Sequence, residues 1–140
     1  MSTPKKILII DDEPDARTFM QAILEEGNYE TMTASNGEEG LTVVKTTPPD
    51  LITLDLLMPN KSGIKFLNEI KSEEHLKGIP IIVISGARQV TGVDMKQYLK
   101  DQPFKDRKKQ VMGEIDITPE AFLEKPVDPP ELIATVKKFI

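Results

Sequence analysis

Acidic residues follow two short apolar segments of this chain, and this arrangement restricts the possible folds more than any other feature. Lys6–Ile10 is followed by Asp11 and Asp12, and Asp50–Leu54 is followed by Asp55. Short runs rich in Ile and Leu predict strands that are buried on both faces, as in a parallel sheet. In such sheets ligands bind outside the carboxyl ends of the strands. The sequence therefore predicts an α/β fold with three carboxylates at one edge.

Two more predicted strands end in polar side chains. Pro80–Ile84 is followed by Ser85, and Ala121–Glu124 is followed by Lys125. Carboxylates gathered at the same edge repel one another unless a cation joins them, and a hard divalent ion with oxygen ligands, Mg²⁺, suits them best. A nucleophile, a metal ion and donors for phosphoryl oxygens together indicate phosphoryl transfer.

Helices are predicted between the strands. Pro14 suits the first turn of the first helix, and Asp128 to Glu131 form a capping box that begins the last one. The first helix has apolar residues at helical spacing, which predicts one buried face: Ala16, Phe19, Met20, Ile23 and Leu24. Five alternating strands and helices predict a doubly wound parallel sheet.

With these residues in view, the chain resembles the receiver domains of response regulators, the CheY-like proteins of two-component signalling. The resemblance rests on the two acidic positions, on Gly63, and on three short segments: Met58-Pro59, Ser85-Gly86 and Phe122 to Pro126. It implies a flavodoxin-like sheet with strand order 2-1-3-4-5. It covers the whole chain except a stretch near residues 88–118.

The resemblance assigns a role to each acid. Asp55 is expected to be the phosphoacceptor and to contribute to the metal site. Asp12 is expected to bind Mg²⁺ directly and Asp11 through a water molecule, with the backbone carbonyl of Leu57 as a further ligand. Lys125 is expected to pair with the phosphoryl oxygens, since lysine acts there as a flexible point charge.

Two further residues are expected to transmit the signal. The Ser85 hydroxyl would bind the phosphoryl group, and Phe122 occupies the position of the family's switch aromatic, although a plain core phenylalanine is the alternative. The Lys125–Pro126 peptide is expected to be cis. His75, the only histidine, is expected to be a solvated side chain in a loop.

The segment between Ser85 and Lys125 is longer than one helix and two turns require, with 39 residues. We expect residues 88–118 to be an insertion or an elongated fourth-helix region. They contain seven basic and five acidic residues, whereas the whole chain has a net charge of −5. The segment is either a solvated extension or an element that docks a partner.

Composition limits the remaining possibilities. The 140 residues predict one domain, 1–140, and the absence of cysteine excludes disulfides and thiol chemistry. No signal peptide or membrane span is apparent, which predicts a cytoplasmic protein. The negative net charge argues against DNA as a partner, and no room remains for a DNA-binding domain, so we expect a receiver that stands alone.

The sequence therefore predicts a phosphoacceptor that receives its phosphoryl group from a sensor histidine kinase or a histidine phosphotransfer protein. Its output would be altered binding to a downstream protein, whose identity the sequence does not indicate. It would catalyse only its own phosphorylation and slow autodephosphorylation. The alternatives are a pseudo-receiver that only binds partners and an aspartate-nucleophile phosphatase of the haloacid dehalogenase type.

Overall fold

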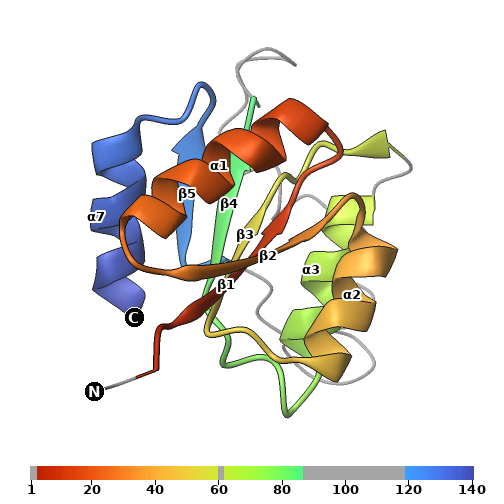
Figure 1. Cartoon of the computed structure of the whole chain (residues 1–140). Coiled ribbons are helices and arrows are strands. Elements are labelled where there is room, and N and C mark those ends of the chain that lie inside the picture. Colours follow the sequence, from red (N-terminus) through yellow and green to blue (C-terminus); the bar gives the residue numbers. More distant parts are fainter. Residues whose placement is uncertain (1–2, 60–61, 87–118) are drawn as a thin grey trace.

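The computed structural model describes residues 3–59, 62–86 and 119–140, and Figure 1 shows its arrangement. A parallel sheet of five strands has the order β2-β1-β3-β4-β5, as predicted. The strands are β1 (Lys6–Ile10), β2 (Glu30–Ala34), β3 (Leu51–Leu54), β4 (Ile81–Ser85) and β5 (Ala121–Glu124). The order reverses between β1 and β3, and this is where doubly wound sheets bind ligands.

Four helices lie within the described residues: α1 (Pro14–Glu26), α2 (Gly37–Thr46), α3 (Ser62–Ser72) and α7 (Pro129–Phe139). Helices α1 and α7 cover one face of the sheet, and α2 and α3 cover the other (Figure 1). The insertion or elongated fourth helix predicted for residues 88–118 lies outside the described residues. The α/β layering matches the flavodoxin-like prediction.

Strand β1 shows how the sheet separates two cores. Leu8 and Ile10 belong to the core beneath α2 and α3, whereas Ile7 and Ile9 belong to the core beneath α1 and α7. All four are at most 1% exposed. Successive side chains of a strand point to opposite faces, so only an unbroken apolar run can serve a sheet that is covered on both sides.

Two helices begin at side-chain caps, and the sequence predicts the one that Asp128 forms. The Asn36 side chain accepts a hydrogen bond from the Glu39 N–H at the start of α2, and Asp128 does the same for Glu131 at the start of α7. Each bond satisfies a backbone donor that has no partner within its helix. These caps fix where the chain leaves the carboxyl edge of the sheet.

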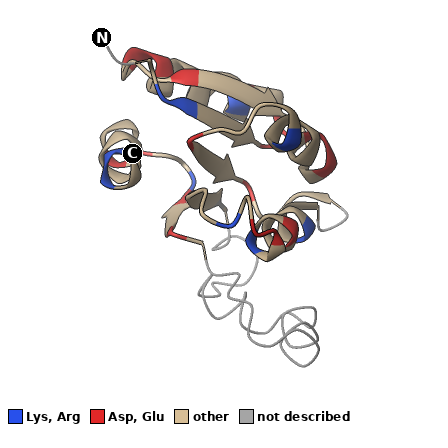
Figure 2. Ribbon diagram, turned by 90° about the horizontal axis from the view of Figure 1, so that it is seen from below, with Lys and Arg blue, Asp and Glu red and all other residues tan. Residues whose placement is uncertain are grey.

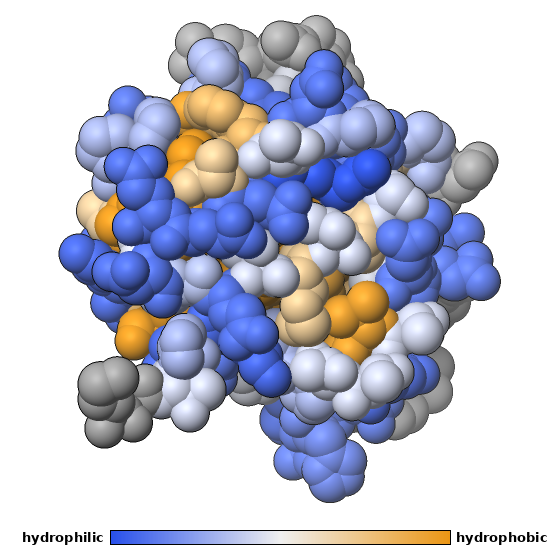
Figure 3. All heavy atoms as spheres, in the orientation of Figure 1, coloured by the Kyte–Doolittle hydropathy of each residue, from blue (hydrophilic) through white to orange (hydrophobic). Residues whose placement is uncertain are grey.

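The predicted apolar face of α1 is only partly buried. Met20 and Leu24 are buried, but Phe19 is 48% exposed, so its assignment to the core was wrong. Phe19 instead lines a shallow groove with Ile23 and, from α7, Ile133. Figure 3 shows apolar side chains gathered at the upper left, over this part of α1 and α7. The sheet covers a narrower strip of α1 than the apolar spacing suggested.

Residues of both charge signs are spread over the helices, as the coloured ribbon in Figure 2 shows. Within the described part of the chain, no helix is long and apolar enough to span a membrane.

Candidate functional site

Three carboxylates meet at the carboxyl edge of the sheet, as predicted. Ile10 of β1 pairs with Leu54 of β3, so the next residues, Asp11 and Asp55, leave neighbouring strands side by side. Together with Asp12 they offer carboxylate oxygens within 4.8 Å of one another. Asp11 is 2% and Asp55 7% exposed, whereas Asp12 is open to solvent. The site therefore has two buried acids and one exposed acid.

Asp11 is held through all of its polar atoms. Its N–H donates to the Ala34 carbonyl at 3.2 Å. Its Oδ1 accepts the Glu13 N–H at 3.0 Å and its Oδ2 accepts Lys125 Nζ at 2.8 Å. Its carbonyl oxygen accepts Arg17 Nη1 at 2.7 Å. Asp11 is thus a fixed part of the framework around the site.

Asp55 has two hydrogen bonds to its carboxylate. Oδ1 accepts the Leu57 N–H at 3.1 Å, and Oδ2 accepts Lys125 Nζ at 3.3 Å. Burial raises the pKa of Asp55 above the ordinary aspartate value; the Lys125 charge opposes this rise, and the neighbouring Asp11 charge adds to it. The carboxylate of Asp55 is therefore held in an environment that favours neutralising its charge.

Lys125 joins the two buried acids. It follows β5, and the Lys125–Pro126 peptide is cis, as predicted. Burial alone would lower the pKa of Lys125, but the hydrogen bond to Asp11 and the attraction of Asp55 outweigh burial and raise it. Lys125 therefore remains a cation facing both Asp11 and Asp55.

A close backbone approach sets the position of the loop that begins at Asp55. A Cβ atom placed on Gly63, in the first turn of α3, would lie 2.7 Å from the carbonyl oxygens of both Asp55 and Leu56. Both neighbours are backbone atoms, so they have little room to move aside. Only glycine lets the start of α3 pack against this loop.

The remaining predicted residues are placed as follows. Ser85 is the last residue of β4 and pairs with Glu124, but the role predicted for its hydroxyl lies outside what the structure describes. Phe122 is half-buried and packs against the core beneath α2 and α3, and its switching role stays a prediction. Leu57 is half-buried in the loop after Asp55, and His75 is exposed beyond α3.

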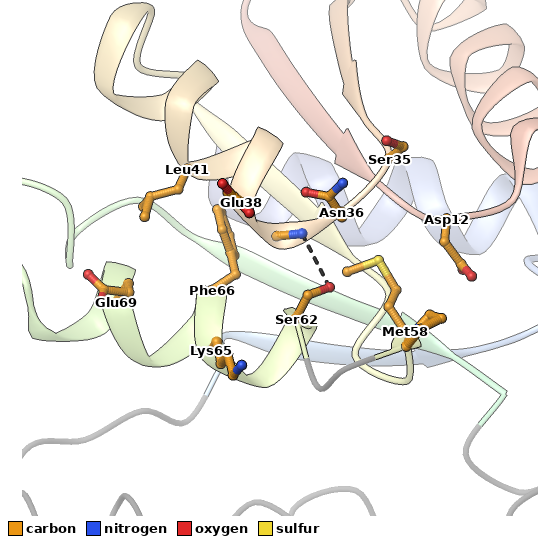
Figure 4. A pocket seen from close by; sticks show the side chains of 12 residues that line it. Asp12, Ser35, Asn36, Glu38, Leu41, Met58, Ser62, Lys65, Phe66 and Glu69 are labelled. Carbon is orange, nitrogen blue, oxygen red and sulfur yellow. Dashed lines mark hydrogen bonds between the residues drawn. The ribbon is translucent and has the colours of Figure 1, made fainter.

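A groove between α2 and α3 runs up to the exposed acid. It has a volume of about 460 Å³ and is lined by Asp12, Met58 and Phe66, among other residues. Figure 4 shows Asp12 and Met58 at one end and Leu41 and Glu69 at the other, with the hydrogen bond from the Gly37 N–H to Ser62 Oγ crossing between the helices. The Met58-Pro59 segment thus forms a wall beside the acid site.

The sequence interpretation missed two sets of polar contacts. Arg17 donates a hydrogen bond to the Asp11 carbonyl oxygen. The sequence signal for this contact is the position of Arg17, one helical turn after the loop that follows β1. Lys71 and Glu120 form an ion pair at 2.7 Å, with the Lys71 side chain only 5% exposed. These two residues are 49 positions apart, and no local spacing signals such a pair.

The donor set fits a hard divalent cation. Three carboxylates have oxygens within 4.8 Å of one another. Their negative charge exceeds the positive charge of the single ammonium that the described residues place among them. Carboxylate oxygens are also the ligands that Mg²⁺ and Ca²⁺ prefer. The arrangement is thus able to hold a metal ion beside a carboxylate that a lysine also contacts.

Comparison with known proteins agrees with this fold and site. The family described as response regulator receiver domain matches residues 7–103. The alkaline phosphatase synthesis transcriptional regulatory protein PhoP of Bacillus subtilis is 32% identical over 97% of this chain and 48% of its own length. The polar-differentiation response regulator DivK of Brucella anthropi is 28% identical over 98% of this chain and 97% of its own length.

A solved structure gives the same result. The signal receiver domain of a signal transduction histidine kinase from Syntrophus aciditrophicus superposes with a TM-score of 0.72 at 27% identity, covering 96% of this chain and 89% of that one. The chain spans about half the length of the first two curated relatives, with 48% and 53% of their lengths covered.

This chain belongs to the response regulator receiver domain family. It is a receiver of the two-component type, the class of domain that accepts a phosphoryl group in signal transduction.

Proposed function

We propose that this receiver takes a phosphoryl group from a phosphohistidine onto Asp55. The observation that carries the proposal is the Asp55 carboxylate itself. It is 7% exposed, accepts Lys125 Nζ at 3.3 Å, and lies within a cluster of three acids. A buried carboxylate that faces a cation and a metal-binding acid pair has the surroundings that phosphoryl transfer requires.

In the proposed reaction, an Asp55 carboxylate oxygen attacks the phosphorus of phosphohistidine. The new bond is P–O, the bond that breaks is P–N, and its electron pair stays on the imidazole nitrogen. Lys125 is placed to pair with the phosphoryl oxygens, because its ammonium lies within hydrogen-bonding distance of Asp55. Asp11 also contacts that ammonium, at 2.8 Å.

Asp11, Asp12 and Asp55 are the residues that would hold Mg²⁺, with the Leu57 carbonyl as the further ligand that the family resemblance implies. A bound Mg²⁺ supplies positive charge to the phosphoryl oxygens during transfer. The chain's own contribution is to fix Asp11 and Asp55 and to leave Asp12 exposed to solvent. Magnesium is favoured over calcium by this small number of carboxylates, since Mg²⁺ keeps several of its waters.

The proposed donor is a sensor histidine kinase or a histidine phosphotransfer protein, and the proposed output is altered binding to a downstream protein. Ser85 and Phe122 are the residues that would couple the phosphoryl group to that output. The chain would catalyse only its own phosphorylation and slow loss of phosphate. Phosphorylation would act by shifting an equilibrium between two conformations that already exist.

Labelling with acetyl phosphate and Mg²⁺, followed on a phosphate-affinity gel, tests this proposal. The parent chain should shift, and Asp55→Asn should not, because an amide of nearly the same shape is no anionic nucleophile. Asp50→Asn is the matched control: Asp50 is exposed at the opposite end of β3, and its carboxylate accepts a hydrogen bond from the Lys6 N–H at 2.8 Å. Undiminished labelling of Asp55→Asn would exclude Asp55 as the acceptor.

The same preparation distinguishes the alternatives. A pseudo-receiver would show no labelling of the parent chain. An aspartate-nucleophile phosphatase would release phosphate from small esters with repeated turnover. That class places its nucleophile after the first strand of the sheet, whereas Asp55 follows β3.

A further inference from the structure

We propose that Arg17 is a positioning residue for the metal ion at Asp12. Arg17 bonds to the backbone carbonyl of Asp11, so it would act through the peptide group that joins Asp11 to Asp12. This inference rests on the metal site of the proposed function. It goes beyond that function by assigning a role to a residue outside the acid cluster.

The contact that carries the inference is short. Arg17 Nη1 donates to the Asp11 carbonyl oxygen at 2.7 Å, a length typical of a hydrogen bond from a charged donor. That carbonyl belongs to the Asp11–Asp12 peptide group. Because a peptide group is planar, fixing its oxygen also fixes the direction in which the chain enters Asp12.

The neighbouring contacts show why Arg17 is the decisive one. The Asp11 side chain is held by the Glu13 N–H and by Lys125, and its own N–H is held by Ala34. The bond from the Glu13 N–H spans the Asp11–Asp12 peptide group, but none of these three bonds holds the carbonyl oxygen of that group. Among the side chains that the structure describes, only that of Arg17 bonds to this carbonyl.

Asp12 depends on this support because, in the described part of the chain, its own carboxylate has none. It is exposed, and within the described ranges no hydrogen bond or ion pair to its side chain is found. An acid with no protein partner is available to an ion, but its position is set only by its backbone. Partners that orient metal ligands in this way commonly change metal affinity when they are removed.

The charge of Arg17 and its proposed positioning role predict opposite changes in Mg²⁺ affinity when Arg17 is removed. A guanidinium close to a cation site repels the cation, so if only its charge mattered, removing Arg17 would tighten Mg²⁺ binding. If Arg17 positions Asp12, removing it weakens binding despite the loss of repulsion. The sign of the change therefore distinguishes the two roles.

The experiment is a titration of the ¹⁵N-labelled chain with MgCl₂ at constant ionic strength, following amide resonances near Asp12. The chain has no tryptophan whose fluorescence would serve instead. Arg17→Met and Arg17→Gln, which lose both the charge and the reach of arginine, should each raise the Mg²⁺ dissociation constant about tenfold. Arg17→Lys keeps the charge and one donor and should recover part of the affinity.

Gln21→Met is the matched control. Gln21 lies one turn further along α1 and donates to Thr31 Oγ1 at 3.2 Å, away from the acid site. This variant removes a side-chain hydrogen bond of the same helix and should bind Mg²⁺ like the parent. Melting curves of all variants, recorded by circular dichroism, set a titration temperature at which each is folded.

Each outcome is decisive. Equal or tighter Mg²⁺ binding in the Met and Gln variants would overturn the positioning role, as would an equal loss in Gln21→Met. Failure of the parent chain to bind Mg²⁺ at all would instead overturn the metal site of the proposed function, and the inference with it. A parent that binds, with Arg17 variants that do not differ from it, refutes the inference alone.

Discussion

Two lysines of this receiver each contact two carboxylate oxygens, at opposite ends of the sheet. At the carboxyl end, Lys125 contacts Asp11 and Asp55. At the amino end of β4 and β5, Lys71 contacts both oxygens of Glu120, at 2.9 and 2.7 Å. The two lysines are in similar contacts, yet only the first belongs to the candidate reaction site.

The difference lies in the charge balance. Lys71 and Glu120 neutralise each other, and Glu120 also accepts the Ile81 N–H at 2.7 Å, so the pair connects α3 to both strands. At the other end, three carboxylates lie together, and the single ammonium of Lys125 contacts two of them, Asp11 and Asp55, among the residues described. A balanced pair is a structural link, whereas a cluster with surplus negative charge is completed only by another cation.

Breaking the balanced pair should have the largest effect on stability. Glu120→Ala leaves Lys71, 5% exposed at its side chain, without a carboxylate and should lower the free energy of unfolding by about 3 kcal/mol. Urea denaturation measures this change. Glu74→Ala is the control: its pair with Lys77 is exposed and should contribute at most about 0.5 kcal/mol. Equal losses in the two variants would show that the Lys71 pair is no stronger than a surface pair.

Removing one carboxylate from the cluster of Asp11, Asp12 and Asp55 should mainly affect the binding of the metal ion. Asp12→Ala should weaken Mg²⁺ binding by about tenfold or more, because too few carboxylate oxygens remain to displace waters from the ion. Amide resonances followed during a Mg²⁺ titration measure this. Glu120→Ala should leave the titration unchanged. An unaltered titration in Asp12→Ala would remove Asp12 from the metal site.

The smallest predicted effect is a gain in stability. Burial raises the pKa of Asp55, so ionised Asp55 opposes folding above its folded pKa, and this cost disappears below the unfolded pKa. Without Mg²⁺, Asp55→Asn should therefore stabilise the fold at pH 7, by less than the loss expected for Glu120→Ala, while Lys125 keeps Asp11 as its partner. The gain should vanish as the pH falls below the ordinary aspartate pKa.

Melting temperatures between pH 3 and pH 8 test this prediction. A destabilised Asp55→Asn at neutral pH would mean that the Lys125 contact outweighs burial, and the two lysine sites would then be alike.

The strands and the acid cluster could be predicted because their signals are local. An unbroken apolar run such as Lys6–Ile10, with acids directly after it, already indicates a buried strand and the end at which its polar residues gather. The strand order came from the family resemblance, and the structure confirms it.

The misses were non-local. Lys71 looks like an ordinary lysine in the last turn of a helix, and its burial depends on Glu120, which follows a long connection. Phe19 has the spacing of a core residue, but its exposure depends on how much of α1 the sheet and α7 cover. Sequence spacing gives the apolar arc of a helix and not the width of the surface beneath it.

The close contact at Gly63 has a consequence for heredity. This glycine has no reactive atom, yet any side chain on it would push against the carbonyls of Asp55 and Leu56. Alleles that alter Gly63 would therefore carry a signalling defect while every acid and the lysine of the site remained intact. The mutation in such alleles would lie at a residue that a search for reactive side chains does not identify.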